Sequence, residues 1–256
     1  CTAQNETSVG EVPRAESVAG GTITASLKGA TAIGSGLPVS SSSLSVSPDG
    51  RLVAVVNPDS DSITILDAIS LTVLSEIAVG DDPRTLSFTP DSQTVLVTNH
   101  GSATLSVVNP IKHIEVAQFS LGSQPYGVVT DGTHAYVTEF ALGEVAIIDL
   151  EKGILLKRVA VGRFPAGLAL SPDGQQLLVT HFFDGSLTVI DIQTHTIHAR
   201  AVAGTDANLS QFVAIAADGG KAYLPQTRAN VTNTAPLFDT TVFPIVNVFD
   251  MANLQL

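Results

Sequence analysis

Three short motifs recur in phase along this chain, and their repetition constrains its fold more than any other feature. The first is a turn motif of the Ser-Pro-Asp-Gly type, whose aspartates are Asp49, Asp91, Asp131, Asp173 and Asp218. The second is an apolar run that ends at Asp67, Asn109, Asp149, Asp191 and Asp250, and the third closes the first four units at Gly80, Gly122, Gly162 and Gly204. A self-similar period of roughly 40 residues is the sequence signature of a repeat architecture.

Each repeat contains four short apolar runs that we interpret as β-strands. Ala166–Leu170 precedes one Ser-Pro-Asp-Gly turn, and the runs of the LLVT, TVID and VAV types follow it, rich in Val, Ile, Leu and Thr. These residues favour strands, while Asp and Gly favour the chain reversal between them. Four-stranded units of about 40 residues, repeated around an axis, predict an all-β fold of the β-propeller type.

The residue pattern of the repeat supports that fold. The pattern S-P-D-G-x-x-L-x-V-T-N, followed by V-x-V-I-D and by V-G-x-x-P, resembles the YVTN family of β-propellers over residues 37–256. The resemblance implies a ring of seven blades. It implies little about function, because this architecture carries many unrelated activities.

The repeat also predicts the domain organisation. We expect a lipoprotein-like tether at residues 1–20 and a β-propeller at residues 21–256, with a strand in 22–36 that completes the last blade. The five predicted blades are 37–80, 81–122, 123–162, 163–204 and 205–256. Either the natural chain continues with further blades, or the five blades close directly around the axis. The first interpretation is favoured, because the last unit ends where a fourth strand should start.

The only cysteine is the first residue. A mature chain that opens with Cys resembles a bacterial lipoprotein, in which the thiol of Cys1 carries a lipid. Thr2 follows, rather than the Asp that the resemblance associates with retention at the inner membrane. We therefore expect an extracytoplasmic protein on the outer membrane or cell surface, held at the membrane through Cys1.

Charge and composition exclude several function classes. The chain has 12 Lys and Arg against 24 Asp and Glu, and its formal net charge is −12. A nucleic-acid-binding protein needs a basic stripe, so nucleic acid is not an expected partner. With one Cys and no C-x-x-C motif, the chain has no covalent c-type haem site and no cysteine-based zinc site.

One rim of the predicted propeller is the candidate binding face. The Asp-Gly turns lie on one rim and repeat nearly unchanged, whereas the loops on the opposite rim vary, and variable loops on a rigid scaffold carry binding sites. Phe140, Phe164 and Phe183 belong to these loops, and an insertion at 227–244 enlarges the fifth unit. The predicted binding residues are Arg84, His100, Tyr126, Glu139, His181, Phe182, Arg228, Phe238 and Phe243.

We predict neither a metal site nor a catalytic residue. The last residue of each second strand occupies one ring of equivalent positions, filled by Asn57, Asn99, Glu139, His181 and Gln226. His181 is the only histidine in that ring, and His100 lies one position further along the chain. His195 and His198 are three residues apart, so on a strand they point to opposite faces.

Three functions remain open from the sequence. The favoured one is a non-catalytic binding or scaffold module with a protein partner. The alternative is the propeller part of a redox protein, because residues 226–244 resemble bacterial surface propellers joined to a c-type cytochrome or di-haem peroxidase domain. In that case the partner is a c-type cytochrome, and the haem belongs to a continuation of the chain or to the partner. The third is a lactonase-like hydrolase.

Overall fold

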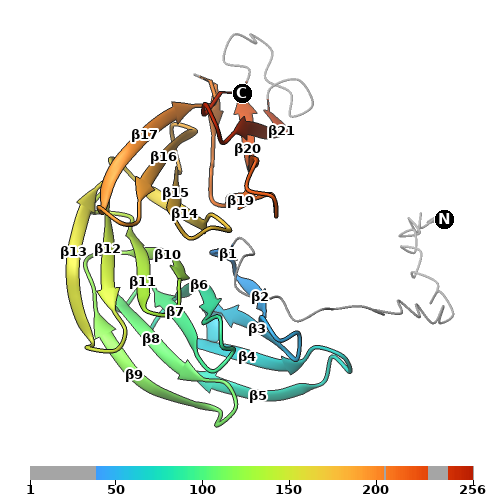
Figure 1. Ribbon diagram of the computed structural model, residues 1–256. Helices are drawn as coiled ribbons and strands as arrows, with labels where there is room; N and C mark the ends of the chain where they lie inside the picture. The colour runs from blue at the N-terminus through green and yellow to red at the C-terminus, as the bar shows by residue number, and fades with distance from the viewer. Residues whose placement is uncertain (1–38, 205, 230–241, 256) are drawn as a thin grey trace, which may run out of the picture. The chain divides into compact units, whose positions relative to one another are not determined.

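The computed structural model describes residues 39–204, 206–229 and 242–255. These residues form strands and turns, with a single short 3-10 helix at Pro58–Ser60 (Figure 1). Within the described ranges, no helix has the length and apolar character needed to cross a membrane. The predicted tether, Cys1 and the strand expected in 22–36 lie outside the described residues.

The strands form five antiparallel sheets that follow one another in chain order. The first four sheets contain β2 (Leu44–Val46), β3 (Leu52–Asn57), β4 (Ser62–Asp67) and β5 (Val73–Ala78); β6 (Pro83–Phe88), β7 (Val95–Asn99), β8 (Thr104–Asn109) and β9 (Ile114–Ser120); β10 (Pro125–Thr130), β11 (His134–Glu139), β12 (Glu144–Asp149) and β13 (Ile154–Ala160); and β14 (Pro165–Leu170), β15 (Gln176–His181), β16 (Ser186–Asp191) and β17 (Thr196–Val202). The fifth contains β18 (Ala207–Asn208), β19 (Ala214–Ile215), β20 (Lys221–Ala229) and β21 (Val242–Asp250).

The Ser-Pro-Asp-Gly motif forms the turn between the first two strands of a sheet. Ser47 Oγ donates to Asp49 Oδ1 at 2.6 Å, and the Asp49 carboxylate accepts from the backbone N–H of Arg51 at 3.1 Å. Gly50 has φ +72°, a conformation that costs an L-residue energy because of its Cβ. Ser171 and Asp173 form the same hydrogen bond at 2.5 Å in the fourth sheet. The repeated motif therefore encodes a repeated turn.

The hydrophobic core lies between neighbouring sheets. Leu52, Ile63 and Ile65 of the first sheet pack with Leu86 and Val97 of the second. Similar clusters join the second sheet to the third, the third to the fourth, and the fourth to the fifth. The middle sheets are covered on both faces, which explains why their second strands are buried along almost their whole length.

A repeated threonine connects each sheet to the next. In the second strand, Thr98 Oγ1 donates to Tyr126 O at 2.5 Å, and Thr138 Oγ1 donates to Ala166 O at 2.8 Å. Thr180 Oγ1 donates to Ser210 O at 2.8 Å in the same way. Each hydroxyl also accepts from the first strand of its own sheet, as Thr138 does from Gly127 N at 2.7 Å. The VT dipeptide of the repeat thus satisfies backbone groups that are buried between sheets.

The segment before the first sheet runs along the inner strands. In β1 (Val39–Ser40), the chain pairs with β14 of the fourth sheet. Ser41 N then donates to Leu168 O at 2.9 Å, and Leu86 N of the second sheet donates to Ser42 O at 2.8 Å. This short stretch was expected to belong wholly to the first unit. Instead it connects the inner strands of the second and fourth sheets before the chain enters β2.

The fifth sheet differs from the others. Its first strand is divided into β18 and β19, while β20 and β21 form a hairpin of two nine-residue strands in which Thr227 pairs with Pro244 and Arg228 pairs with Phe243. Both ends of the insertion at 227–244 are therefore continuations of these strands rather than loop. Residues 230–241, including Phe238, lie outside the described residues.

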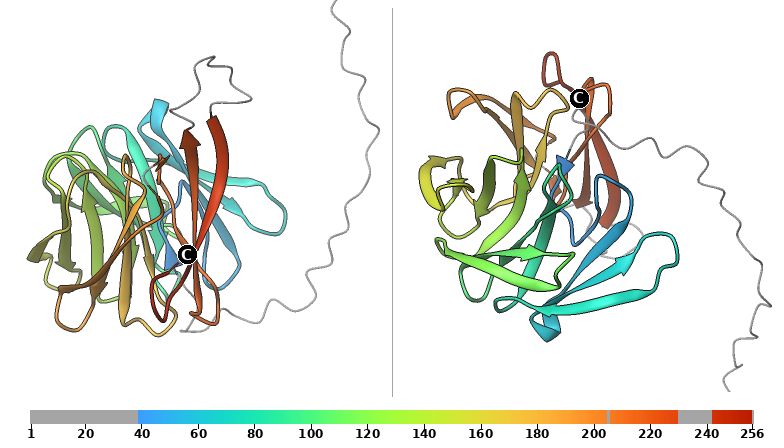
Figure 2. Two further views of the ribbon diagram at one scale, coloured as in Figure 1. Left: turned by 90° about the horizontal axis from the view of Figure 1, so that it is seen from above. Right: turned by 60° about the horizontal axis from the view of Figure 1, so that its bottom comes forward.

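Consecutive four-stranded antiparallel sheets that pack face to face are the architecture of a β-propeller. Figure 2 shows the same succession of sheets from two further directions. The fold predicted from the sequence is confirmed: the structure is all-β, with four units of four strands in the predicted order and a fifth unit made of a divided first strand and two further strands.

Candidate functional site

Turns of one kind gather on one rim and the variable loops gather on the other. On the turn rim, Asp49 N donates to Ser92 Oγ at 3.1 Å, joining the first and second turns. On the loop rim, Asp82 N donates to Asp61 Oδ1 at 2.8 Å, and Val161 N donates to Gly143 O at 2.9 Å. The separation of a uniform rim from a variable rim, inferred from the repeat, is present in the structure.

The loop rim carries a cluster of aromatic side chains, which we call the aromatic surface. Its members are Tyr126, Phe140, Phe164, Phe182 and Phe183. The Phe140 ring lies at the centre, with centroids 5.9 Å from Tyr126, 5.2 Å from Phe164 and 5.8 Å from Phe182. Phe183 packs edge-on against Phe164 at 4.9 Å. The surface therefore spans the third and fourth sheets without a gap.

Part of the aromatic surface faces solvent. Phe183 is 56% exposed and Phe164 is 36% exposed, whereas Phe88 and Phe249 in the core are 3% and 1% exposed. Aromatic residues make up only 5% of the sequence, so five rings in one cluster is a strong concentration. Exposed aromatic side chains that cluster on a variable rim are a candidate contact site.

Close backbone packing places these loops. The β11–β12 loop, which carries Phe140, lies against the linker that carries Phe164, because Val161 N and Gly162 N both donate to Gly143 O, at 2.9 and 3.1 Å. Gly143 has φ +74°, and a Cβ there would lie 2.8 Å from Gly162 O. Only glycine therefore allows this approach of the two segments.

A polar group adjoins the aromatic surface on the second sheet. Asp82 Oδ2 accepts from Arg84 Nη2 at 2.8 Å and lies 3.1 Å from His100 Nδ1. Burial, followed by the Arg84 guanidinium, lowers the pKa of His100. Burial raises the pKa of the Tyr126 hydroxyl, which Arg84 partly opposes. Arg84, His100 and Tyr126 thus form one neighbourhood, as expected from their shared rim.

Glu139 and His181 lie beneath this rim rather than on it. Glu139 is 0% exposed, and its carboxylate accepts from Arg158 Nε at 2.6 Å and from Gly122 N at 2.5 Å. His181 is 2% exposed, with Nδ1 2.9 Å from Arg163 O and Nε2 2.8 Å from Thr188 Oγ1. Both side chains support the loops above them from within the sheet. The sequence-based interpretation as surface contacts did not anticipate their burial.

The same internal role applies to the other members of that ring of positions. Asn99 Nδ2 donates to Thr104 and Ser106, and Gln226 Nε2 donates to Gly185 O at 3.1 Å. The side chain at this position differs between units, but in each unit it joins the second strand to neighbouring backbone or to the third strand. The ring is therefore a structural layer below the loop rim.

Arg228 and Phe243 lie on the hairpin of the fifth sheet. Arg228 Nε donates to Asp206 Oδ2 at 2.5 Å, and Phe243 is its cross-strand neighbour. No ring pair among the described residues joins Phe243 to the aromatic surface. Of the predicted binding residues, the structure therefore brings Tyr126 and Phe182 together through the ring of Phe140. Arg228 and Phe243 lie apart from them, on the hairpin of the fifth sheet.

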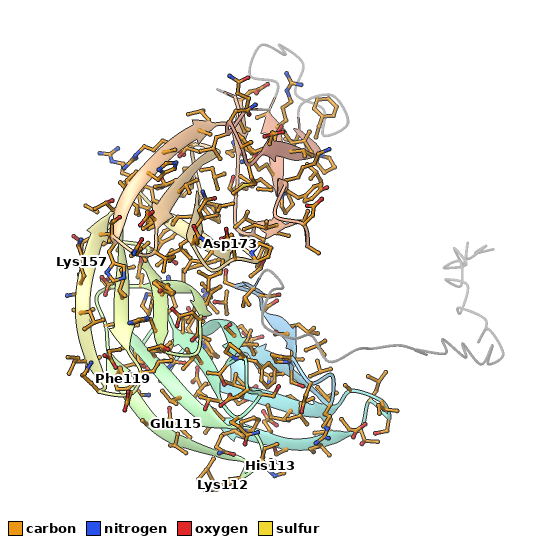
Figure 3. The ribbon with its side chains drawn as sticks, viewed as in Figure 1. Lys112, His113, Glu115, Phe119, Lys157 and Asp173 are labelled. Atoms are coloured by element: carbon orange, nitrogen blue, oxygen red, sulfur yellow. The ribbon has the colours of Figure 1, made fainter. Side chains whose placement is uncertain are left out.

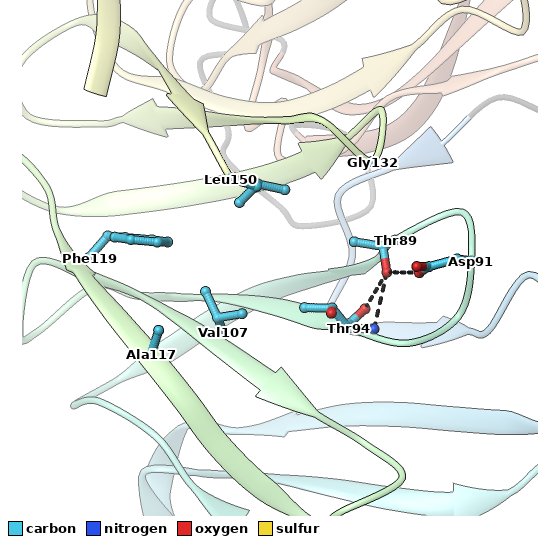
Figure 4. Close-up of a pocket in the computed structure, with 8 residues that line it drawn as sticks. All are labelled: Thr89, Asp91, Thr94, Val107, Ala117, Phe119, Gly132 and Leu150. Atoms are coloured by element: carbon cyan, nitrogen blue, oxygen red, sulfur yellow. Dashed lines mark hydrogen bonds between the residues drawn. The ribbon is translucent and has the colours of Figure 1, made fainter. Parts of the chain in front are cut away.

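In the part of the chain that is described, no three His, Cys, Asp or Glu side chains are placed to hold a metal ion. A cavity of about 220 Å³ lies between the second and third sheets, lined by Val107, Phe119 and Leu150 and by Thr89 and Asp91 of a turn (Figure 4). Small-molecule sites are usually larger, about 300–1,000 Å³. This cavity is an inter-sheet crevice at the turn rim, away from the variable loops.

Comparison with known proteins identifies the family. The sequence model of the YNCE-like beta-propeller family matches residues 16–168, more than half of the chain. The chain belongs to this family. The YNCE-like assignment agrees with the propeller fold, whereas the finer YVTN resemblance stays a prediction. No curated protein matches the sequence.

Solved structures resemble this YNCE-like chain in fold. Kuenenia stuttgartiensis hydrazine synthase has a TM-score of 0.75 at 23% identity, over 81% of this chain and 62% of that chain. The Cps50 (Swd1) beta-propeller domain of Myceliophteria thermophila has a TM-score of 0.62 at 11% identity, over 83% and 72% of the two chains. A functionally unknown protein from Desulfotomaculum acetoxidans has a TM-score of 0.64 at 14% identity, over 82% of this chain and 70% of that chain. The YNCE-like chain thus spans under two thirds of the hydrazine synthase chain.

The aromatic surface was only partly visible in the sequence. Its five members lie close to the start or end of equivalent strands in two consecutive units, which is why they were assigned to one rim. What periodicity could not show is that Phe140 lies between the neighbouring units and contacts rings from both. Aromatic residues that recur beside equivalent strand ends in adjacent repeats were the available signal.

Proposed function

We propose that this YNCE-like propeller is a non-catalytic binding module that holds a protein partner on its loop rim. The observation that carries the proposal is the aromatic surface. Exposed Phe side chains in contact with one another suit binding of a protein, because aromatic residues are enriched at the energetic centres of protein interfaces.

The surrounding geometry supports a rigid binding surface. Glu139 and His181 fix the strand ends beneath the loops, and the Gly143 contact fixes the β11–β12 loop against its neighbour. A surface whose backbone is already held loses little conformational freedom on binding. The proposal places the module outside the cytoplasm, lipid-anchored through Cys1, on the strength of the sequence alone.

Site-specific photocross-linking in the native host tests the proposal. A photoreactive residue replaces Leu142, which is exposed in the loop beside Phe140, and a control replaces Leu155, which is exposed on the outer strand β13. We expect a discrete cross-linked protein from position 142, absent from position 155, and lost in Phe182→Ala/Phe183→Ala. Equal products from both positions, or products unaffected by the double substitution, would contradict the proposal.

The same experiment distinguishes the scaffold function from the redox function that the sequence left open as an alternative. Haem staining of the product from position 142 reports whether the captured chain is a c-type cytochrome. A stained partner would favour the redox role, and an unstained one the scaffold role.

A further inference from the structure

The charges around the aromatic surface are strongly unequal. The described loops of this rim carry six carboxylates, at Asp59, Asp61, Asp81, Asp82, Asp184 and Asp206, and three guanidiniums, at Arg84, Arg163 and Arg228. Two of the guanidiniums are already paired, Arg84 with Asp82 at 2.8 Å and Arg228 with Asp206 at 2.5 Å. Among the described residues, four carboxylates on this rim have no ion pair, against one guanidinium.

In the chain, Asp59, Asp61 and Asp81 precede the rings and Asp184 follows them, while the unpaired Arg163 directly precedes Phe164. Asp184 directly follows Phe183, and it is exposed while accepting from Ser186 N at 2.9 Å. Asp61 accepts from Asp82 N and so lies beside the Asp82–Arg84 pair, and Asp81 directly precedes Asp82; Asp59 lies in the same loop as Asp61. The outer strands do not share this imbalance: Lys112 and Lys157 accompany Glu115 on β9, β13 and their turns (Figure 3).

An apolar centre with an acidic margin selects a partner of particular chemistry. We infer that the aromatic surface binds a protein segment that presents an apolar side chain flanked by Lys or Arg. The apolar side chain packs against Phe140 and Phe183, and the cations pair with Asp184 or lie over the exposed ring faces. This inference rests on the proposed function and names the chemistry of its partner.

The inference is tested in solution with three labelled peptides and the full chain. The first repeats Lys-Leu-Ser, the second replaces Lys by Glu, and the third replaces Leu by Ser. We expect only the first to bind at low salt, with affinity falling several-fold between 50 and 200 mM NaCl as exposed charges are screened. Binding of the Glu peptide, or equal binding of the Ser peptide, would overturn the inference.

Variants locate the binding. Phe182→Ala/Phe183→Ala should weaken the first peptide by more than about tenfold, since central aromatic residues carry most interface energy. Asp184→Asn should weaken it and reduce its salt dependence. Leu155→Ala and Asp218→Asn are matched exposed controls from the outer strand and the turn rim, and neither should change binding. Weakening by the controls to the same extent would overturn the assignment to this surface.

A lipid surface is the competing occupant. In a Cys1→Ser chain, which cannot carry the proposed lipid, vesicles of phosphatidylcholine with and without phosphatidylglycerol should fail to bind; binding that Phe183→Ala abolishes would overturn the inference. Its failure is distinguishable from that of the proposed function. A partner cross-linked at position 142 whose contact segment is acidic would refute the inference alone, whereas the absence of any cross-linked partner would refute the proposed function.

Discussion

At the scale of the residue, equivalent positions in the repeated units carry different side chains with the same structural role. The end of each second strand needs a polar side chain that bonds to its neighbours. Glu139, His181 and Gln226 reach backbone groups, whereas Asn99 donates to the hydroxyls of Thr104 and Ser106 on the third strand. The choice has consequences, because Glu139 needs the Arg158 guanidinium, whose pKa is raised by the hydrogen bond to that carboxylate. A buried carboxylate without a partner is strongly destabilising.

His181 makes the stability of the fold depend on pH. Burial lowers its pKa, with Arg200 acting in the same direction and the Arg163 carbonyl and Asp184 opposing. Between that lowered pKa and the value of about 6.5 in the unfolded chain, the unfolded state binds more protons. The contribution of His181 is therefore fully present above pH 6.5 and is lost as the pH falls through the folded pKa.

Replacement of His181 tests this dependence. In His181→Asn, which copies the residue of the second sheet, the free energy of unfolding should fall less steeply below pH 6.5, by up to about 1.4 kcal/mol per pH unit. Denaturant titrations at several pH values measure it. His113→Asn, in an exposed turn, is the control and should keep the steep dependence. An unchanged slope in His181→Asn would contradict the assignment.

At the scale of the element, the threonine of the second strand fixes how sheets adjoin. Thr138→Val keeps the shape of the side chain but removes the partner of Ala166 O and Gly127 N, both buried between the third and fourth sheets. Leaving a buried group without a partner costs about 1–3 kcal/mol. Chemical denaturation should show this loss, while the exposed Thr72→Val should be nearly neutral; equal effects would mean that the inter-sheet bond is dispensable.

Two glycines with the same backbone conformation separate strain from crowding. Gly50 has φ +72° with no atom within 4 Å of a Cβ, whereas Gly143 has φ +74° and meets Gly162 O at 2.8 Å. Alanine at either site is destabilising by about 1–2 kcal/mol, because its Cβ is strained in the left-handed conformation. Gly143→Ala pays roughly 1–3 kcal/mol more for crowding and should also weaken peptide binding, because the Phe140 loop must shift. Thermal unfolding of both variants compares them; similar losses would show that the close approach costs nothing.

At the scale of the whole molecule, the first and last sheets each leave one face open. In β3, burial alternates, with Leu52, Ala54 and Val56 inward and Val53 and Val55 outward. The outward Val53 and Val55 are only half-buried, their neighbour Val46 is 50% exposed, and Val246 on the fifth sheet is 60% exposed. Open apolar faces and free strand edges favour association. Whether further blades cover them or the ring closes with five stays a prediction from the sequence.

The open faces should make this chain associate by itself. Val46→Lys/Val246→Lys places a charge on each outward face without touching the inter-sheet clusters. Sedimentation velocity should show a smaller associated fraction than for the unmodified chain at equal concentration. Lys152→Val, on an exposed turn, is the control: it changes a surface charge away from the open faces and should not lower the associated fraction. An unchanged associated fraction in the double variant would mean that the faces do not drive association.

The repeat by itself determined the fold class, the strand order and the division into two rims. It could do so because each turn depends on local side-chain bonds, such as Ser47 to Asp49, and each strand on local apolar spacing. The sequence also placed Tyr126, Phe140 and Phe182 on one rim. It could not show that their rings meet, that Glu139 and His181 are buried, or that Ser41 and Ser42 connect the second and fourth sheets. Those contacts join residues far apart in the chain, so only the packing of the sheets against one another decides them.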